Sequence, residues 1–210
     1  MLHLLRSGSL KYLSLFAIGV LSGNTWAHTG VLSEVHTHAS AIGSLMAGWL
    51  HPWTGLDHLS VMLAVGGWGA LTSRPGSMDW FRAPVIFVLM LLAGAVMGMF
   101  GVTLPSVEPM LAASVLVLGL MVFTRAQVSG VVSAVLVGTF ALFHGVAHGV
   151  ELSNVSYSVL TLAGLLVATL LLHVLGLVAG WNLRASSVWL TRAAGAAVAG
   201  VGAHLFLALA

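Results

Sequence analysis

The chain has 210 residues, of which 59% are hydrophobic and only 6% are charged, whereas about a quarter of a typical soluble domain is charged, so the composition indicates an integral membrane protein. The formal net charge of +2 rests on seven scattered basic residues, too sparse for a phosphate-binding surface, which excludes nucleic acid as a partner. The chain contains no cysteine, which excludes disulfides and thiolate metal sites and leaves nitrogen and oxygen as the ligands for any metal.

Residues 1–27 have the layout of a secretory signal peptide. Arg6 and Lys11 provide a basic region, an apolar core of about ten residues follows, and the segment ends at Ala27 in a small-residue cleavage pattern. This core is too short to cross a bilayer, which takes about 20 residues. Cleavage would make His28 the first residue of the mature protein. The alternative is an uncleaved first helix, and in both cases the chain then continues outside.

Residues 28–40 are polar and are predicted to form a periplasmic segment. Their histidines either capture cations before these reach the membrane domain or are simply solvated. These histidines are His28, His36 and His38.

The membrane domain is predicted to comprise residues 41–210. Ala41 to Leu50 is apolar but too short to cross alone, and Pro52 removes a backbone donor, so we expect a short re-entrant or interfacial helix packed against the bundle. Six later stretches have the length and apolarity of spans, which predicts an all-α protein with six transmembrane helices. They are Gly55 to Leu71, Ala83 to Gly101, Ser106 to Phe123, Val128 to Gly149, Tyr157 to Gly180 and Val188 to Leu209.

Five arginines predict the orientation of these spans. If residue 28 is outside, the arginines fall in or beside inside loops, while the outside loops carry Glu108 and Glu151 but no Lys or Arg. The positive-inside rule predicts this asymmetry. We therefore expect a multi-pass protein of the bacterial inner membrane, with the mature N-terminus and the C-terminus both periplasmic. The arginines are Arg74, Arg82, Arg125, Arg184 and Arg192.

Seven histidines and carboxylates are predicted to share one level near the outer face. Counted along the spans at a rise of about 1.5 Å per residue, they lie at the outer ends of the first, fourth and sixth spans. Ionisable groups in a bilayer are costly, so the cluster predicts a functional site, and imidazole with carboxylate favours a metal ion. Only His173, in the fifth span, lies deeper. The seven are His51, Asp57, His58, His144, His148, Glu151 and His204.

The spacing within the fourth span supports this grouping. His144 and His148 are four residues apart and Glu151 is three further on, so all three share one helix face. Gly145 and Gly149 are expected to leave room beside the imidazoles.

Asp57 has three interpretations. It is either a direct metal ligand, a carboxylate that orients an imidazole, or a helix N-cap, since Pro52 and Gly55 precede it near a helix start.

Small residues such as Gly94 and Gly98 predict close packing within the bundle more than a dedicated dimer interface, and the sequence is also compatible with a homo-oligomer.

Two motifs carry a resemblance to a known family. H-P-x-x-G-x-D-H from His51 and F-H-G-x-A-H-G-x-E from Phe143 resemble the HupE/UreJ family of secondary nickel permeases, some associated with cobalt, which supply hydrogenase and urease maturation. The likeness covers the whole chain. The first motif is also similar to the H-x-x-x-x-D-H signature of a larger nickel/cobalt transporter family, but here five residues separate His51 from Asp57, which favours HupE/UreJ. The resemblance implies metal binding by the two motifs, through His51, Asp57, His58, His144, His148 and Glu151.

The sequence thus predicts a transporter, and not an enzyme, that imports Ni²⁺ or Co²⁺ as its substrate and holds no permanently bound cofactor. The chain has no nucleotide-binding loop, so we expect the membrane potential rather than ATP hydrolysis to drive uptake. His173 is expected to relay the ion toward the cytoplasm. The alternative is an intramembrane zinc-dependent hydrolase built on the same cluster, although no nucleophile motif accompanies it. Haem ligation would require matching histidine pairs on facing helices.

Overall fold

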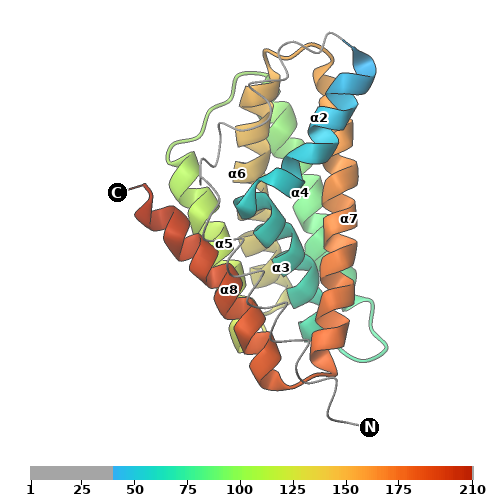
Figure 1. Ribbon diagram of the computed structural model, residues 1–210, viewed down its shortest axis with the longest axis vertical. Coiled ribbons are helices and arrows are strands. Elements are labelled where there is room, and N and C mark those ends of the chain that lie inside the picture. The colour runs from blue at the N-terminus through green and yellow to red at the C-terminus, as the bar shows by residue number, and fades with distance from the viewer. Residues whose placement is uncertain (1–39, 210) are drawn as a thin grey trace, which may run out of the picture.

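The computed structural model describes residues 40–209, so the predicted signal peptide and the histidines His28, His36 and His38 lie outside the described residues. Within the described part the chain forms seven α-helices and one short 3-10 helix, without a strand (Figure 1). The elements are α2 (Ala41–Thr54), α3 (Leu56–Thr72), η2 (Asp79–Phe81), α4 (Arg82–Met99), α5 (Val107–Thr124), α6 (Gly130–Leu152), α7 (Ser158–Arg184) and α8 (Val188–Leu207).

Five of these helices are long and apolar enough to cross a membrane: α4 with η2 at its start, α5, α6, α7 and α8. The predicted all-α membrane protein is therefore confirmed. The predicted span from Gly55 to Leu71 corresponds to α3, which has 17 residues. The boundaries of the other spans differ from the prediction by a few residues, and the largest extension is in α7, which continues past Gly180 to Arg184.

Helices α2 and α3 run end to end along α7 (Figure 1). At one end, the Ser44 hydroxyl donates to the carbonyl of Ser156, just before α7 begins. At the other end, Arg184 in the last turn of α7 donates to the carbonyl of Ala70 in α3. The short helix predicted to pack against the bundle thus corresponds to α2, which extends beyond the predicted end and packs along α7.

The break between α2 and α3 lies at Gly55 and not at Pro52. Pro52 is buried inside α2, and the helix continues through it to Thr54. Proline is tolerated in membrane helices when neighbouring groups and local adjustments satisfy the backbone that it disturbs. Gly55 has an extended backbone (φ −89°, ψ 117°), which ends one helix and starts the next.

Helices α4 and α6 approach closely along a line of glycines. A Cβ at Gly94 would overlap the carbonyl oxygen of Leu142, and one at Gly145 would overlap the carbonyl oxygen of Leu91. Backbones in such contact exclude even a methyl group, and small residues serve this purpose in membrane bundles. The predicted role of Gly94 in bundle packing is therefore confirmed.

The centre of the bundle is formed by α3, which packs against α2, α4, α5, α7 and α8. Most of its residues are buried, including Val61, Met62 and Val65, which pack with Phe87 and Leu118 in one apolar core. His58 also lies on α3, one turn before Val61 and Met62. The N-terminal turn of α3 therefore places a polar side chain directly beside the apolar core.

Candidate metal centre

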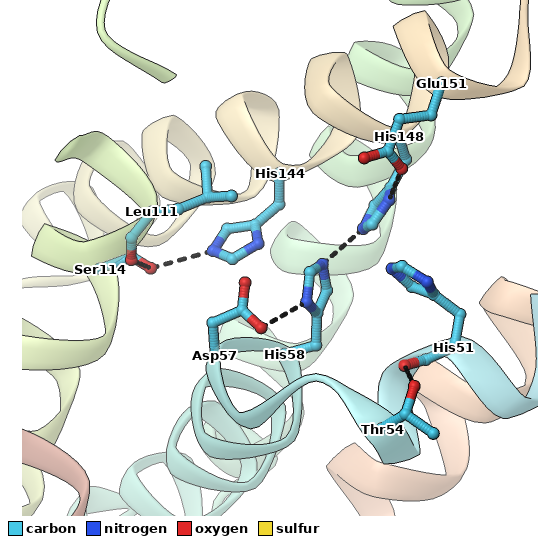
Figure 2. A network of polar contacts seen from close by, with 9 residues as sticks. All are labelled: His51, Thr54, Asp57, His58, Leu111, Ser114, His144, His148 and Glu151. Atoms are coloured by element: carbon cyan, nitrogen blue, oxygen red, sulfur yellow. Dashed lines mark hydrogen bonds and ion pairs between the residues drawn. The ribbon is translucent and has the colours of Figure 1, made fainter. Parts of the chain in front are cut away.

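Three histidines from three helices converge where α2 meets α3. They are His51 of α2, His58 of α3 and His148 of α6, and one ring nitrogen of each lies within 4.8 Å of the others (Figure 2). The ring centroid of His51 is 5.0 Å from that of His58 and 4.8 Å from that of His148. His58 and His148 are almost fully buried. Three imidazoles at this separation form a candidate site for a borderline divalent ion.

Two carboxylates set the direction of the imidazole nitrogens. Asp57 Oδ1 accepts a hydrogen bond from His58 Nδ1 at 2.9 Å, and Glu151 Oε2 lies 3.4 Å from His148 Nδ1. Each carboxylate favours a proton on the Nδ1 beside it and so leaves the lone pair on Nε2. The two Nε2 atoms face each other at 2.6 Å.

At that distance the two Nε2 atoms share a hydrogen bond, in which one of them carries the proton and the other accepts it. A proton is small enough for the observed separation, which is that of a short hydrogen bond. A metal ion with metal–nitrogen bonds of about 2.0–2.1 Å would require the two rings to move apart. The pair can therefore hold a proton or, after a small displacement, a metal ion.

Asp57 orients an imidazole, which is one of the three roles considered for it. The N-cap of α3 is Gly55, so the N-cap interpretation of Asp57 is wrong. Asp57 instead lies in the first turn, where a negative charge also complements the helix dipole. Its Oδ2 is buried and makes no hydrogen bond with any described residue, so this oxygen also remains a candidate ligand.

Gly55 leaves the space in which Asp57 and His58 make their hydrogen bond. A Cβ at position 55 would lie 2.8 Å from Asp57 Oδ1 and 3.0 Å from His58 Nδ1. The glycine of the first motif therefore keeps space for the hydrogen bond that orients His58.

His144 lies beside the three-histidine group but not within it. Its ring centroid is 5.3 Å from that of His58. Ser114 of α5 donates its hydroxyl proton to the carbonyl of Leu111, so the Ser114 oxygen accepts from His144 Nε2 at 2.9 Å. The lone pair of His144 is then on Nδ1. His144 and His148 share one face of α6 as predicted, but they meet His58 from different sides (Figure 2).

The motif glycines of α6 serve a different purpose from the one predicted. A Cβ at Gly145 or Gly149 would overlap a carbonyl oxygen of α4, that of Leu91 or Ala95 respectively. The room that these glycines provide is therefore occupied by the α4 backbone, while the imidazoles of His144 and His148 face His58 of α3.

His51, Asp57 and His58 were expected at the mouth of the first span, after a helix that ends at Pro52. The structure instead continues α2 through Pro52 to Thr54, so His51 lies inside α2 while Asp57 and His58 lie in the first turn of α3. A cavity of about 10 Å³, lined by Gly48, His51 and His148 among others, adjoins the group, and this is about the space that one water molecule requires.

Two predicted residues lie apart from the group. His173 is buried in α7, where its Nδ1–H donates to the carbonyl of Thr169 at 2.8 Å. The His173 lone pair is therefore on Nε2, which is buried without a hydrogen-bond partner among the described residues. His204 is exposed in the last turn of α8, so its predicted membership of the cluster is wrong. Its helix packs mainly against α5, which keeps it away from α2 and α6.

Two residues that adjoin the histidines were not predicted from the sequence. Ser114 binds His144, and Phe87 of α4 packs against both His144 and His173. Neither could be recognised as a neighbour of the histidines from the sequence, because serine and phenylalanine are ordinary in an apolar span.

Comparison with known proteins identifies the family. The HupE / UreJ protein family matches residues 14–205, nearly the whole chain. A curated relative, Protein HupE of Rhizobium leguminosarum bv. viciae, is 40% identical over 177 residues, which are 84% of this chain and 91% of the relative. No solved structure matches the chain. The resemblance inferred from the two motifs is confirmed, and the chain belongs to the HupE/UreJ family.

Proposed function

We propose that this protein imports Ni²⁺ or Co²⁺ across the bacterial inner membrane as a secondary transporter, and that its cargo supplies hydrogenase or urease maturation. The observation that carries the proposal is the convergence of the His58 and His148 Nε2 atoms beside His51, inside a bundle of apolar helices. Membership of the HupE/UreJ family supports it. Imidazoles without thiolate suit borderline divalent ions, and a site that must release its ion needs only moderate affinity.

The break at Gly55 also supports transport. We take α2 and α3 as the two halves of a sixth crossing, because they run end to end along α7. Transporters often bind substrate where a membrane helix is interrupted, since the half-helix ends offer partial charges there. The C-terminal end of α2, where His51 lies, is negative and favours a cation. Asp57 offsets the positive N-terminal end of α3.

The positions of the arginines support the proposed orientation. Arg74 follows α3, Arg125 follows α5 and Arg184 ends α7, and Arg184 and Arg125 donate to backbone carbonyls of α3 and α7 at one end of the bundle. By the positive-inside rule this end is cytoplasmic. The beginning of α2 and Glu151 are then at the periplasmic end, as is the C-terminal end of α8.

His173 is the second binding position in the proposed ion path. It lies in α7 with its Nε2 lone pair buried and available to an ion, at the level where Gly66 of α3 contacts the α7 backbone. A single hydrolytic centre has no use for a buried ligand outside the three-histidine group. We therefore favour transport over the intramembrane zinc hydrolase, which would use the same group of histidines. An inward divalent ion gains about 2.3 kcal/mol per charge for each 100 mV of membrane potential.

The test is the uptake of radiolabelled nickel and cobalt by cells that lack other importers. We expect His58→Ala and His148→Ala to reduce uptake to the level of the empty vector, because each removes a converging nitrogen. His173→Ala is expected to reduce it as well. His204→Ala is the matched control and should retain most of the uptake, because His204 is exposed on α8.

The outcomes separate the function from the site. Wild-type uptake no higher than the empty vector for both metals, despite normal membrane insertion, would contradict the transporter. Normal uptake by the first two variants would leave a transporter whose site lies elsewhere.

A further inference from the structure

The side chain of Phe87 contacts His144 through one ring pair and His173 through another. It projects from α4 and is fully buried. Its ring centroid is 6.0 Å from that of His144 and 5.1 Å from that of His173, the latter in an edge-on arrangement. The His144 ring in turn lies 5.3 Å from that of His58. One phenyl ring therefore links the histidines of α3 and α6 to the histidine of α7.

The surroundings of Phe87 are closed. Met62, Leu118 and Leu172 are fully buried and belong to the same apolar core as Phe87. Such cores are packed nearly as densely as organic crystals. An ion that moves from the neighbourhood of His144 to that of His173 must therefore displace the ring.

The cytoplasmic side of His173 is different. A cavity of about 290 Å³ lies at the arginine-bearing end, and its lining includes Trp68, Asp79 and Arg82. Trp68 is two residues after Gly66, which touches the backbone of His173. The space that leads to the cytoplasm thus begins at Trp68, two residues along α3 from the contact with His173.

We propose that Phe87 is the internal barrier of the ion path, a ring that separates the outer histidine group from His173 and turns aside to let the ion pass. This inference rests on the proposed transport function. A ring suits this position for two reasons. In its resting place it fills the core, and its face attracts a cation while the ion passes, as aromatic faces do in cation–π pairs. The barrier would keep the two sides from being connected, as alternating access requires.

The experiment compares passive nickel flux with nickel binding. Wild type, Phe87→Ala and Phe87→Leu are purified, nickel binding is measured in detergent, and efflux of radiolabelled nickel is followed from preloaded proteoliposomes. We expect Phe87→Ala to raise nickel efflux at least about tenfold, because it removes the ring that blocks the path. Phe87→Leu should raise efflux less, because leucine still fills part of the space of the ring. Nickel affinity should stay within about twofold of wild type, because His51, His58 and His148 keep their contacts.

The matched control is Leu91→Ala. Leu91 is fully buried on the same helix, one turn from Phe87, so its truncation leaves a comparable cavity in the same core. Efflux from this variant should match wild type. Equal increases in Leu91→Ala and Phe87→Ala would show general loosening and overturn the barrier.

The remaining outcomes are also decisive. If Phe87→Ala does not insert stably, Phe87→Leu decides, and wild-type efflux from that variant overturns the inference. Wild-type flux with no effect of either Phe87 variant refutes the barrier and leaves the transporter intact. No nickel or cobalt flux through wild-type protein that binds the ion refutes the transporter, and the barrier with it.

Discussion

Each imidazole of the facing pair has a carboxylate beside its Nδ1. Asp57 is buried and bonded to His58, whereas Glu151 is partly exposed and lies farther from His148. The Asp57 contact is therefore the stronger of the two, because a buried charge-assisted hydrogen bond is shorter and less screened by water. It fixes the ring of His58, the residue that contacts His51, His144 and His148 at once.

Asp57→Asn should weaken nickel binding about 10- to 100-fold, the usual cost of removing a carboxylate that orients a metal-binding histidine. The amide keeps the shape of the side chain, so the fold is expected to persist. Isothermal titration of the purified protein with nickel measures the affinity. Asp79→Asn is the control, because Asp79 pairs with Arg74 and Arg82 away from the site. Unchanged affinity in Asp57→Asn would show that Asp57 has no part in holding the ion.

Individual residue types could be predicted from the sequence more readily than their partners. His51, His58 and His148 were identified because ionisable side chains in an apolar segment require an explanation. The contacts of His144 with Ser114 and Phe87 could not be predicted, because they join α6 to α5 and α4 through side chains that are common in any span. His204 was misassigned because depth along a helix does not say which neighbour the helix packs against.

At the scale of the elements, two interruptions have different consequences. Pro52 is accommodated inside α2, whereas Gly55 ends the helix. From the sequence, the loss of a backbone donor at Pro52 was the stronger signal. The outcome depends on the surrounding helices, since α7 packs against α2 through Gly48 and Gly164 and holds it in helical form. This is why the existence of the helices could be predicted but the continuation of α2 through Pro52 could not.

The α4–α6 seam should be intolerant of added volume near the histidines. Gly145→Ala would press a methyl group into the carbonyl of Leu91 and force the helices apart, so we expect a loss of about 1–3 kcal/mol in the free energy of unfolding. Nickel affinity should fall as well, because α6 carries His148. Unfolding in detergent, followed by circular dichroism, measures the first effect.

Gly138→Ala is the matched control on the same helix. A Cβ there would meet only the side chains of Met90 and Ile86, at 3.3 and 3.5 Å, which can adjust. Equal stability of the Gly138→Ala and Gly145→Ala variants would show that the seam is not closely packed in the membrane.

At the scale of the whole molecule, a crossing made from α2 and α3 gives six crossings, with the N- and C-terminal ends of the described chain on one side. The five long apolar helices alone would put these ends on opposite sides. The arginine-bearing loops share one face in either case, because two of the five helices separate each from the next, so the sixth crossing decides on which side the beginning of α2 lies. It also decides whether the histidine group opens toward the periplasm.

Cysteine accessibility tests this arrangement cleanly, because the chain has no cysteine of its own. Ala41→Cys and Asn154→Cys, exposed at the start of α2 and between α6 and α7, should react with a membrane-impermeant maleimide in intact cells. Met78→Cys and Ser186→Cys, exposed beyond α3 and α7, should react only after permeabilisation. The pair Ala41 and Met78 brackets the broken crossing, while Asn154 and Ser186 bracket the continuous helix α7 as the control. Protection of Ala41→Cys in intact cells, with Asn154→Cys still labelled, would place Ala41 on the same side as Met78 and mean that α2 and α3 do not cross together. The histidine group would then have to reach the ion by another route.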